Sequence, residues 1–269
     1  MTHRLANLLA HPLTRGLDID SPSTTALRRR IVLDKPFLRR IYEEWYERIR
    51  VQIPAIDGEV LELGSGAGFM DEHIDGLITS EVFATPGASV VLDGTELPFA
   101  DSSLRAIVMT DVFHHIPAPR AFLFEASRCL KPAGVVVMIE PWVSPWSTFV
   151  YRRFHHEPFE PDAERWEFPA TGPLSGANGA LPWIVFERDR LRFEQEFPRL
   201  RVRSVLPMMP VSYLLSGGVA MRSLMPGFTY PLWRGMESAI GAMTNAAAMF
   251  ALIVIEVREP QPSATAPVS

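Results

Sequence analysis

The residues with the clearest chemical use in this sequence lie in a glycine-rich turn that directly follows a short apolar strand. Residues 59–63 read Glu-Val-Leu-Glu-Leu, and Gly64-Ser-Gly-Ala-Gly68 follows at once. Glycines at such a turn can adopt positive φ and let the backbone approach a ligand closely, and the first N–H groups of a following helix point toward that ligand. We therefore predict a ligand-binding turn followed by a helix, with an ordinary glycine turn as the alternative.

Carboxylate and imidazole side chains follow at the ends of later predicted strands. Glu81 and Asp93 lie near the ends of the second and third strands, and Asp111 precedes the pair His114-His115 after the fourth. The carboxyl ends of strands in an open parallel sheet surround one crevice, so we expect these side chains to lie near the glycine turn. A histidine there can act as a general base near neutral pH. Solvated carboxylates, and a histidine that only begins a helix, are the alternatives.

The elements that must position these residues alternate along the chain. Short apolar strands are predicted at 59–63, 77–83, 88–93, 104–111 and 135–140, and a helix at 120–130 precedes the last of them. Such alternation is typical of an α/β fold, in which helices cover both faces of a parallel sheet. Residues 200–215 resume a strand-like pattern, and a small-residue helix from residue 238 then leads into a final strand at 250–257.

Two further segments flank this alternating core. Leu38, Ile41, Trp45 and Ile49 recur at helical spacing, so the first fifty-odd residues are expected to be helical. Residues 141–199 are too aromatic for disorder and too broken for regular elements, and we expect an ordered insertion that covers the binding site. The predicted organisation is a helical cap at 1–55, a core at 56–140, the insertion at 141–199, the completion of the sheet at 200–258 and a flexible tail at 259–269.

A nicotinamide or flavin site is the main competitor for the glycine turn. Its fingerprint needs a small residue where this chain has Phe69 or Asp71, so the pattern fails. The successive motifs instead resemble the type-11 branch of class I S-adenosylmethionine-dependent methyltransferases. The similarity covers residues 58–140 and comprises Glu62-x-Gly-x-Gly-x-Gly68, Asp93-Gly-Thr-Glu-Leu-Pro-Phe99, Asp101-Ser-Ser-Leu104, Asp111-Val-Phe-His-His115 and Arg128-Cys-Leu-Lys-Pro-Ala-Gly134, with Ala133 where the branch usually has glycine.

This resemblance implies a fold and a cofactor. The fold is a doubly wound, Rossmann-like sheet of seven strands whose last strand, here 250–257, runs antiparallel. The cofactor is S-adenosyl-L-methionine, whose ammonium group a carboxylate on the first strand can attract. The implied cofactor-binding residues are Glu62 at the methionine ammonium, Gly64, Ser65, Gly66 and Gly68 along the methionine and ribose, Glu81 at the ribose hydroxyls, Asp93 and Gly94 at the adenine, and Asp111.

The reacting end of the cofactor is expected near the residues that follow the fourth strand. Methyl transfer needs an oriented acceptor and, for a hydroxyl or a carbon acid, a base, so the predicted catalytic residues are His115, His114 and Asp111. The segment His155–Glu157 of the insertion could join the histidine pair in a metal site. Nothing in the spacing demands a metal, and none is predicted.

Only composition bears on the acceptor. The aromatic residues of the insertion can bind sugars, prenyl chains or aromatic rings, and they can equally form the insertion's own core. We predict methylation of an oxygen or carbon on a small-molecule or lipid- or sugar-linked acceptor, with transient contact to a membrane surface. The alternative is a non-catalytic protein of the same fold that binds a nucleotide or a partner.

Composition and charge set the outer limits. The chain has 269 residues, of which 47% are apolar and 21% charged, as in soluble globular proteins. The net charge of −5 argues against a general nucleic-acid grip, and the net +4 of the first fifty residues is assigned to the cap, outside the site. The single Cys129 excludes a disulfide framework and a cysteine-rich zinc site. We recognise no signal peptide or membrane span and expect a cytoplasmic protein.

Overall fold

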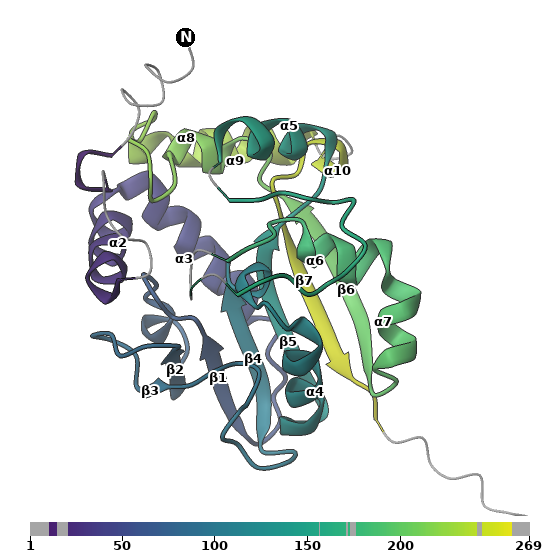
Figure 1. The fold of residues 1–269 in the computed structure, drawn as a ribbon. Coiled ribbons are helices and arrows are strands. Elements are labelled where there is room, and N and C mark those ends of the chain that lie inside the picture. The colour runs from purple at the N-terminus through teal and green to yellow at the C-terminus, as the bar shows by residue number, and fades with distance from the viewer. Residues whose placement is uncertain are drawn as a thin grey trace, which may run out of the picture.

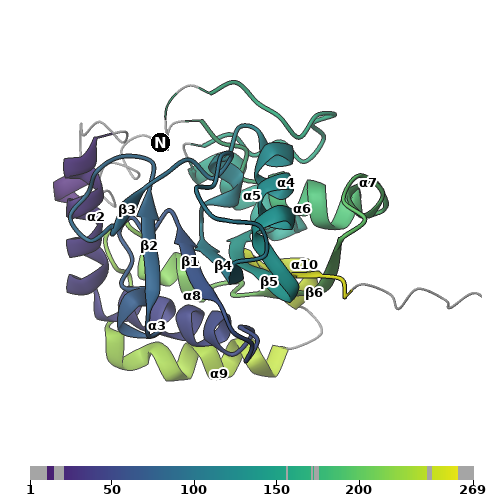
Figure 2. The ribbon, with the colours of Figure 1, turned by 90° about the horizontal axis from the view of Figure 1, so that it is seen from below.

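Strand order and strand direction determine where this fold can bind a ligand. The computed structural model describes residues 11–14, 21–155, 157–170, 172, 176–240 and 244–259. His156, residues 1–10 and 15–20 of the predicted cap and residues 260–269 of the predicted tail lie outside the described residues. Seven strands form one sheet in the order β3-β2-β1-β4-β5-β7-β6 (Figures 1 and 2). They are β1 (Glu59–Leu63), β2 (Leu77–Glu81), β3 (Val90–Val91), β4 (Leu104–Thr110), β5 (Leu130–Pro141), β6 (Leu200–Met208) and β7 (Phe250–Val257).

Strand pairing confirms the predicted doubly wound sheet with an antiparallel last strand. The strands β1 to β5 pair in parallel, whereas β7 is antiparallel to both β5 and β6. The strand order reverses between β1 and β4, which creates a crevice at the carboxyl ends of these neighbouring strands. In Figure 1 these ends point upward, toward α2, α5 and α8.

Helices cover both faces of the sheet. The helices α4, α6 and α7 lie on one face, while α3 lies on the other with α8 and α9 outside it (Figure 2). The longer helices are α2 (Pro22–Asp34), α3 (Pro36–Arg50), α4 (Pro119–Cys129), α5 (Pro145–Phe154), α7 (Arg190–Glu196) and α9 (Tyr230–Ile240). The shorter ones are α6 (Leu181–Trp183), α8 (Ser212–Ser216) and α10 (Thr244–Ala247), and single turns occur at η1 (Pro12–Thr14), η2 (Met70–Glu72), η3 (Phe113–His115), η4 (Ile184–Arg188) and η5 (Gly227–Thr229). No helix among the described residues is long and apolar enough to cross a membrane.

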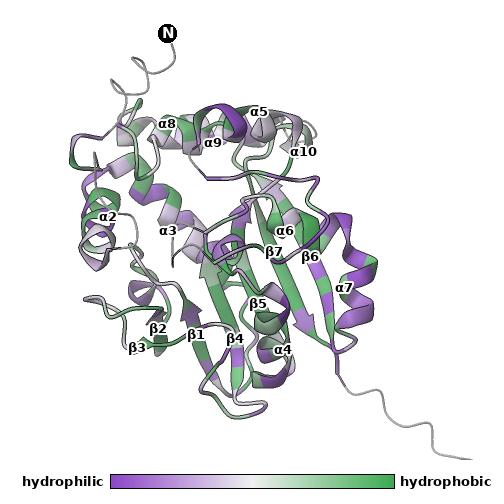
Figure 3. Cartoon of the chain, viewed as in Figure 1, coloured by the Kyte–Doolittle hydropathy of each residue, from purple (hydrophilic) through white to green (hydrophobic). Residues whose placement is uncertain are grey.

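The core runs along the central strands. The strands β4, β5 and β7 are almost continuously buried, as expected for strands covered on both faces, and Figure 3 shows them as largely apolar. The predicted apolar face of α3 is confirmed, because Leu38, Ile41, Trp45 and Ile49 are all buried. Trp45 packs on Phe250 of β7, with ring centroids 4.9 Å apart. The helix α3 therefore anchors the N-terminal segment to the sheet.

The helix predicted after the glycine turn is wrong. Residues 64–76 contain only the single turn η2 before β2 begins. Phe69 and Met70 are buried there, and the Phe69 ring lies 5.0 Å from the ring of Tyr46 on α3. Because α3 already covers this part of the sheet, no helix is needed after β1, and the glycine turn does not lead into a helix N-terminus.

Other element boundaries also differ from the predictions. The insertion is more regular than expected, because α5, α6, η4 and α7 all form within residues 141–199. The strand-like pattern at 200–215 divides into β6 and the helix α8. The strand β3 is only two residues long, and β5 starts five residues earlier than the predicted position 135, at Leu130. Short apolar runs without clear periodicity explain these errors, since they fit a strand and a buried helix equally well.

Candidate functional site

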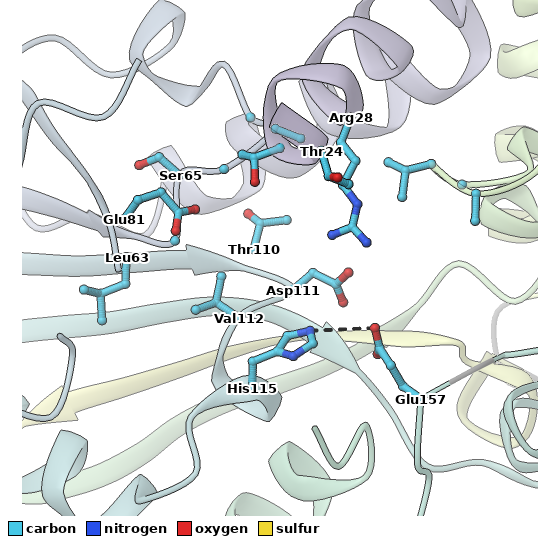
Figure 4. A pocket seen from close by; sticks show the side chains of 18 of the residues that line it. Thr24, Arg28, Leu63, Ser65, Glu81, Thr110, Asp111, Val112, His115 and Glu157 are labelled. Atoms are coloured by element: carbon cyan, nitrogen blue, oxygen red, sulfur yellow. Dashed lines mark ion pairs between the residues drawn. The ribbon is translucent and has the colours of Figure 1, made fainter. Parts of the chain in front are cut away.

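A cavity of about 860 Å³ opens at the carboxyl ends of β1, β2 and β4 (Figure 4). Its walls come from distant parts of the sequence, because α2, α3, α5 and α8 all contribute side chains. Every predicted site residue except His114 lines this cavity. The fold therefore brings together residues that the sequence placed at separate strand ends.

The glycine turn forms one end of the cavity. Gly64 and Gly66 have φ of +62° and +42°, values that favour glycine. The N–H of Ser65 donates to the carbonyl of Ser80 at 2.8 Å, and Ser65 Oγ accepts from the Ser80 N–H at 3.0 Å. These two bonds tie the turn to β2 and fix its shape without the predicted helix.

The structure gives a second reason for the glycines. A Cβ atom on Gly68 would lie 2.7 Å from Tyr46 Oη, and one on Gly64 would lie 2.6 Å from a Val112 methyl group. At Gly66 the nearest atom would be Glu81 Oε1, at 3.1 Å. From the sequence, we explained these glycines by the close approach of a ligand. The structure shows that side chains of the protein itself also leave no room for a Cβ atom at Gly64 and Gly68.

Two carboxylates flank the turn from β1 and β2. Glu62 and Glu81 are both buried and both line the cavity. Burial raises the pKa of Glu62 to about 7, with the nearby charges of Asp71 and Glu81 adding to the effect. Burial also raises the pKa of Glu81, although hydrogen bonds from the N–H groups of Val82 and Gly66 oppose it. Both carboxyls would gain from a ligand that offers cations or donors.

Asp93 and Gly94 form the outer edge of the same end. Asp93 is exposed and lies two residues beyond β3. Its Oδ1 accepts from both the N–H and the hydroxyl of Thr95, at 2.8 and 2.7 Å. This local turn orients the carboxylate at the rim of the cavity, next to the partly buried Gly94.

Asp111 lies between the two ends of the cavity. It follows β4 directly and adopts φ of +62°, which is uncommon for a residue with a side chain. Its N–H donates to the carbonyl of Ile139 on β5 at 2.8 Å, so the strained backbone is held by the sheet. Burial raises the pKa of Asp111 to about 7. Figure 4 shows its carboxylate directed toward Arg28 across the cavity.

The fully buried Glu140, at the end of β5, positions the segment that follows Asp111. Its Oε1 accepts from the N–H groups of Val112 and Phe113 at 2.9 and 2.7 Å, and its Oε2 accepts from His114 Nδ1 at 2.7 Å. Burial lowers the pKa of His114, but hydrogen bonds to Glu140 and Glu157 outweigh it and raise the pKa well above its usual value. His114 therefore lies behind the cavity wall, between two carboxylates.

His115 has a different environment from its neighbour. Its Nδ1 lies 3.1 Å from the carbonyl of Gly176, which can only accept, so Nδ1 carries the proton. Its Nε2 lies 3.9 Å from Glu157 Oε1, and Figure 4 shows this pair at the cavity floor. Burial and the charge of His114 lower the pKa of His115 to about 3. The imidazole is neutral at pH 7, with its Nε2 lone pair available.

Several cavity residues were not among the predicted site residues. Arg28 on α2 points its guanidinium into the cavity, and Tyr42, Tyr151 and Tyr213 line the wall around Asp111 (Figure 4 shows Arg28). These residues come from the cap, the insertion and the C-terminal region, and no local motif marks them. Most aromatic residues of the insertion pack into the hydrophobic core, as Trp142 and Trp166 do, and among them Tyr151 and Phe154 of α5 line the cavity.

The comparisons with known proteins agree with this geometry. Residues 61–138 match the family model described as a methyltransferase domain. Three uncharacterized methyltransferases from strains of Mycobacterium tuberculosis are 37% identical to this chain over 62 residues, which are 23% of this chain. The match spans only 24% of these curated relatives.

Solved structures share the fold over most of the chain. Geranyl diphosphate C-methyltransferase from Streptomyces coelicolor A3(2), solved with Mg²⁺, geranyl diphosphate and S-adenosyl-L-homocysteine, superposes with a TM-score of 0.50 at 15% identity. The alignment covers 82% of this chain and 81% of that one. A geranyl diphosphate methyltransferase solved with S-adenosylmethionine also gives a TM-score of 0.50, at 14% identity, covering 86% of this chain and 90% of that one. At such identities the likeness establishes the fold alone, and the match to the methyltransferase-domain model is confined to residues 61–138.

Proposed function

We propose that this chain is an S-adenosyl-L-methionine-dependent methyltransferase acting on an oxygen or carbon of a small-molecule or lipid- or sugar-linked acceptor. The observation that carries the proposal is the continuity of the cavity. One space of about 860 Å³ joins the glycine turn and its acids to Asp111, His115 and the tyrosines. Sites for small ligands typically measure about 300–1,000 Å³, so this volume suits two ligands that meet inside it.

The acids at the strand ends suit the parts of the cofactor. Glu62 is buried with a raised pKa, and a bound ammonium group would favour its charged form. Glu81 Oε2 already accepts a hydrogen bond from the Val82 N–H at 3.2 Å, and the other lone pairs of this carboxylate could accept hydrogen bonds from the ribose hydroxyls. Asp93, with Gly94 beside it, would accept from the adenine amino group at the rim. When bound, this cofactor supplies an activated methyl group on a sulfonium centre.

The other end of the cavity suits deprotonation of an acceptor. His115 offers an unprotonated Nε2, and the Gly176 carbonyl fixes its tautomer. A proton taken from an acceptor O–H or C–H would pass to this atom as the acceptor bonds to the methyl carbon and the electrons of the carbon–sulfur bond remain on sulfur. Asp111 and Arg28 would orient polar groups of the acceptor. The roles of His114 and Glu140 would be to hold this segment in place.

The walls favour an acceptor with a sizeable apolar part. Val150, Tyr151, Phe154 and Tyr213 line the cavity. On the outer side of α5, Trp146 and Phe149 are 37% and 47% exposed, which offers an apolar surface for a lipid-linked molecule. The geranyl diphosphate methyltransferases with the same fold are compatible with such an acceptor. A cytoplasmic location with transient contact to a membrane surface forms part of this proposal.

Calorimetric titration with S-adenosylmethionine and S-adenosylhomocysteine tests the cofactor. We expect micromolar affinity, and the absence of binding at millimolar concentration of either compound would refute the methyltransferase function. Incubation of cell-extract fractions with methyl-labelled cofactor then identifies the acceptor. Cofactor binding without any methylated product would favour the alternative, a non-catalytic binding protein.

A further inference from the structure

Three potential metal ligands converge at the floor of the cavity and directly behind it, where His114 lies. His114 and His115 come from η3, while Glu157 comes from the insertion, more than forty positions later. His114 Nε2 lies 3.5 Å from Glu157 Oε2, and His115 Nε2 lies 3.9 Å from Glu157 Oε1. One ligand atom from each residue falls within 4.8 Å of the others. The sequence raised the segment 155–157 as a possible partner of the histidine pair but did not demand a metal, and tertiary structure selects Glu157.

The two imidazoles are already oriented for coordination. His114 Nδ1 bonds to the buried carboxylate of Glu140 at 2.7 Å, and His115 Nδ1 bonds to the carbonyl of Gly176 at 3.1 Å. Histidines that bind metals typically donate their second N–H in just these two ways, to a carboxylate or to a backbone carbonyl. Both Nε2 atoms thus face Glu157, and each Nδ1 has a partner that fixes its ring.

The His–Glu distances within the cluster are longer than a short charge-assisted hydrogen bond and close to the spacing of metal ligands. A charge-assisted N–H···O bond is usually about 2.7–2.9 Å long, whereas the His114–Glu157 and His115–Glu157 separations are 3.5 and 3.9 Å. Ligands about 2.1 Å from a zinc ion at tetrahedral angles lie about 3.4 Å from one another. The two His–Glu distances are therefore close to the ligand spacing of such an ion, and the ligand atoms all lie within 4.8 Å of one another.

The charge around the cluster also favours a cation. The carboxylates of Asp111, Glu140 and Glu157 lie around the two histidines. Arg28 faces Asp111 across the cavity (Figure 4). His114 shares its protons with Glu140 and Glu157. A divalent ion in place of the His114 Nε2 proton would add positive charge where three acids meet.

We propose that His114, His115 and Glu157 bind a divalent transition metal ion, of the class of Zn²⁺, Fe²⁺ or Mn²⁺, with open coordination positions toward the cavity. Two imidazoles and one carboxylate form the donor set of many catalytic sites for such ions, whereas Mg²⁺ and Ca²⁺ prefer oxygen ligands. This inference replaces the sequence expectation of no metal. If the proposed methyltransferase function holds, an oxygen of the acceptor would occupy an open position beside Asp111. With the ion bound, the Nε2 lone pair of His115 would coordinate it, and His115 would act as a ligand in place of its role as the base.

Titration of the full-length, metal-depleted protein, free of any histidine tag, tests this site. We expect one equivalent of Co²⁺ to bind and to produce the visible absorption bands of a four- or five-coordinate ion, with Zn²⁺ displacing it. Glu157→Gln and His115→Ala should each weaken binding at least about 100-fold, because loss of an outer partner alone typically costs 10–100-fold. The matched controls are Glu160→Gln, at an exposed acid of the same insertion, and His73→Ala, at a histidine that packs against Tyr46 of α3. Both control variants should bind Co²⁺ as tightly as the parent protein.

Two results would overturn the metal site. One is a folded parent protein that binds S-adenosylhomocysteine but neither Co²⁺ nor Zn²⁺. The other is stoichiometric binding that Glu157→Gln and His115→Ala leave unchanged, since the ion would then sit elsewhere. Calorimetry with S-adenosylhomocysteine on the same samples separates this outcome from failure of the proposed function, because the residues near the cofactor end are untouched by these substitutions. The unfolding temperature of each variant shows whether loss of binding reflects loss of the fold.

Discussion

Substitution of Glu140 by alanine should be among the costliest single changes in this protein. The carboxylate is fully buried and satisfies three donors: the N–H groups of Val112 and Phe113 and the Nδ1–H of His114. Each buried donor left without a partner costs about 1–3 kcal/mol, so three of them give about 3–6 kcal/mol after partial relaxation. Domains of this kind are stable by about 5–15 kcal/mol, so the loss would approach the whole margin.

Glutamine at position 140 separates the charge from the hydrogen bonds. Its amide oxygen can still accept from Val112 and Phe113, but its NH₂ group would face His114 Nδ1. His114 must then accept at Nδ1 and carry its proton on Nε2. We expect Glu140→Gln to cost about 1–2 kcal/mol, the net worth of one charge-assisted bond. It should also weaken metal binding about 10–100-fold, because Nε2 would no longer offer its lone pair.

Urea denaturation of metal-depleted protein, followed by tryptophan fluorescence, measures these costs. The slope with urea must stay constant for the midpoint shift to report stability. The matched control is Glu256→Ala on the neighbouring β7, whose ion pair with Arg201 at 2.7 Å is partly exposed and should contribute no more than about 1 kcal/mol. A loss below about 1 kcal/mol for Glu140→Ala, similar to the control, would refute the reasoning that Glu140 holds η3.

Three further predictions concern the turn, the base and the cap. Gly66→Val should weaken S-adenosylhomocysteine binding at least about 10-fold, because φ is +42° and the new Cβ would lie 3.1 Å from Glu81 Oε1; strain of this kind costs about 1–3 kcal/mol. The control is Gly235→Val, in open space on α9, and equal affinities of the two variants would show that the turn is misassigned. His115→Ala should lower turnover about 10²–10⁴-fold while cofactor affinity stays within about 3-fold, and full activity would exclude a role in catalysis. Burial raises the pKa of Glu44, but hydrogen bonds from Arg234, Tyr230 and Arg48 lower it to about 2 from 4.5. Glu44 should therefore stabilise the fold above pH 4.5 and lose this contribution as the pH falls toward 2. Arg234→Met should reduce this pH dependence of stability in urea titrations at successive pH values, and an unchanged dependence would contradict the assignment.

Local sequence signals predicted which residues line the glycine-turn end of the cavity. The strand β1, the glycine turn and the acids Glu62, Glu81 and Asp93 occupy the expected places, because each depends on a few adjacent residues. Positive φ at Gly64 is a local requirement, and strand ends in a parallel sheet meet at one edge by topology alone. Apolar periodicity likewise identified α3, because apolar residues on one face at helical spacing fit a helix and not a strand.

Residues whose roles depend on tertiary packing could not be predicted. In the sequence, Glu140 is an acid at the end of a predicted strand like any other. Its hydrogen bonds to Val112, Phe113 and His114 become visible only when β5 lies beside η3. The segment 155–157 could be named as a possible partner of the histidine pair, but only the path of the insertion over the sheet shows that Glu157 reaches it. The missing helix after β1 has the same origin, since α3 covers that face of the sheet with Tyr42 and Tyr46 stacked around Phe69. Local propensity is overridden wherever a distant element already supplies the packing.

The positive charge of the N-terminal segment is explained by this packing. Assignment of the whole +4 to a cap outside the site is wrong, because Arg28 lines the cavity. Most neighbouring arginines pair within their own helix, as in Arg30–Asp34, Arg39–Glu43, Arg48–Glu44 and Arg50–Glu47. Such exposed pairs contribute little to stability, and they neutralise charge that could otherwise attract phosphates. Arg28 has no ion-pair partner among the described residues and faces Asp111 in the cavity. The cap therefore forms a wall of the site, and any ligand that fills the cavity must contact α2 and the sheet together, so its binding free energy stabilises the packing of the cap.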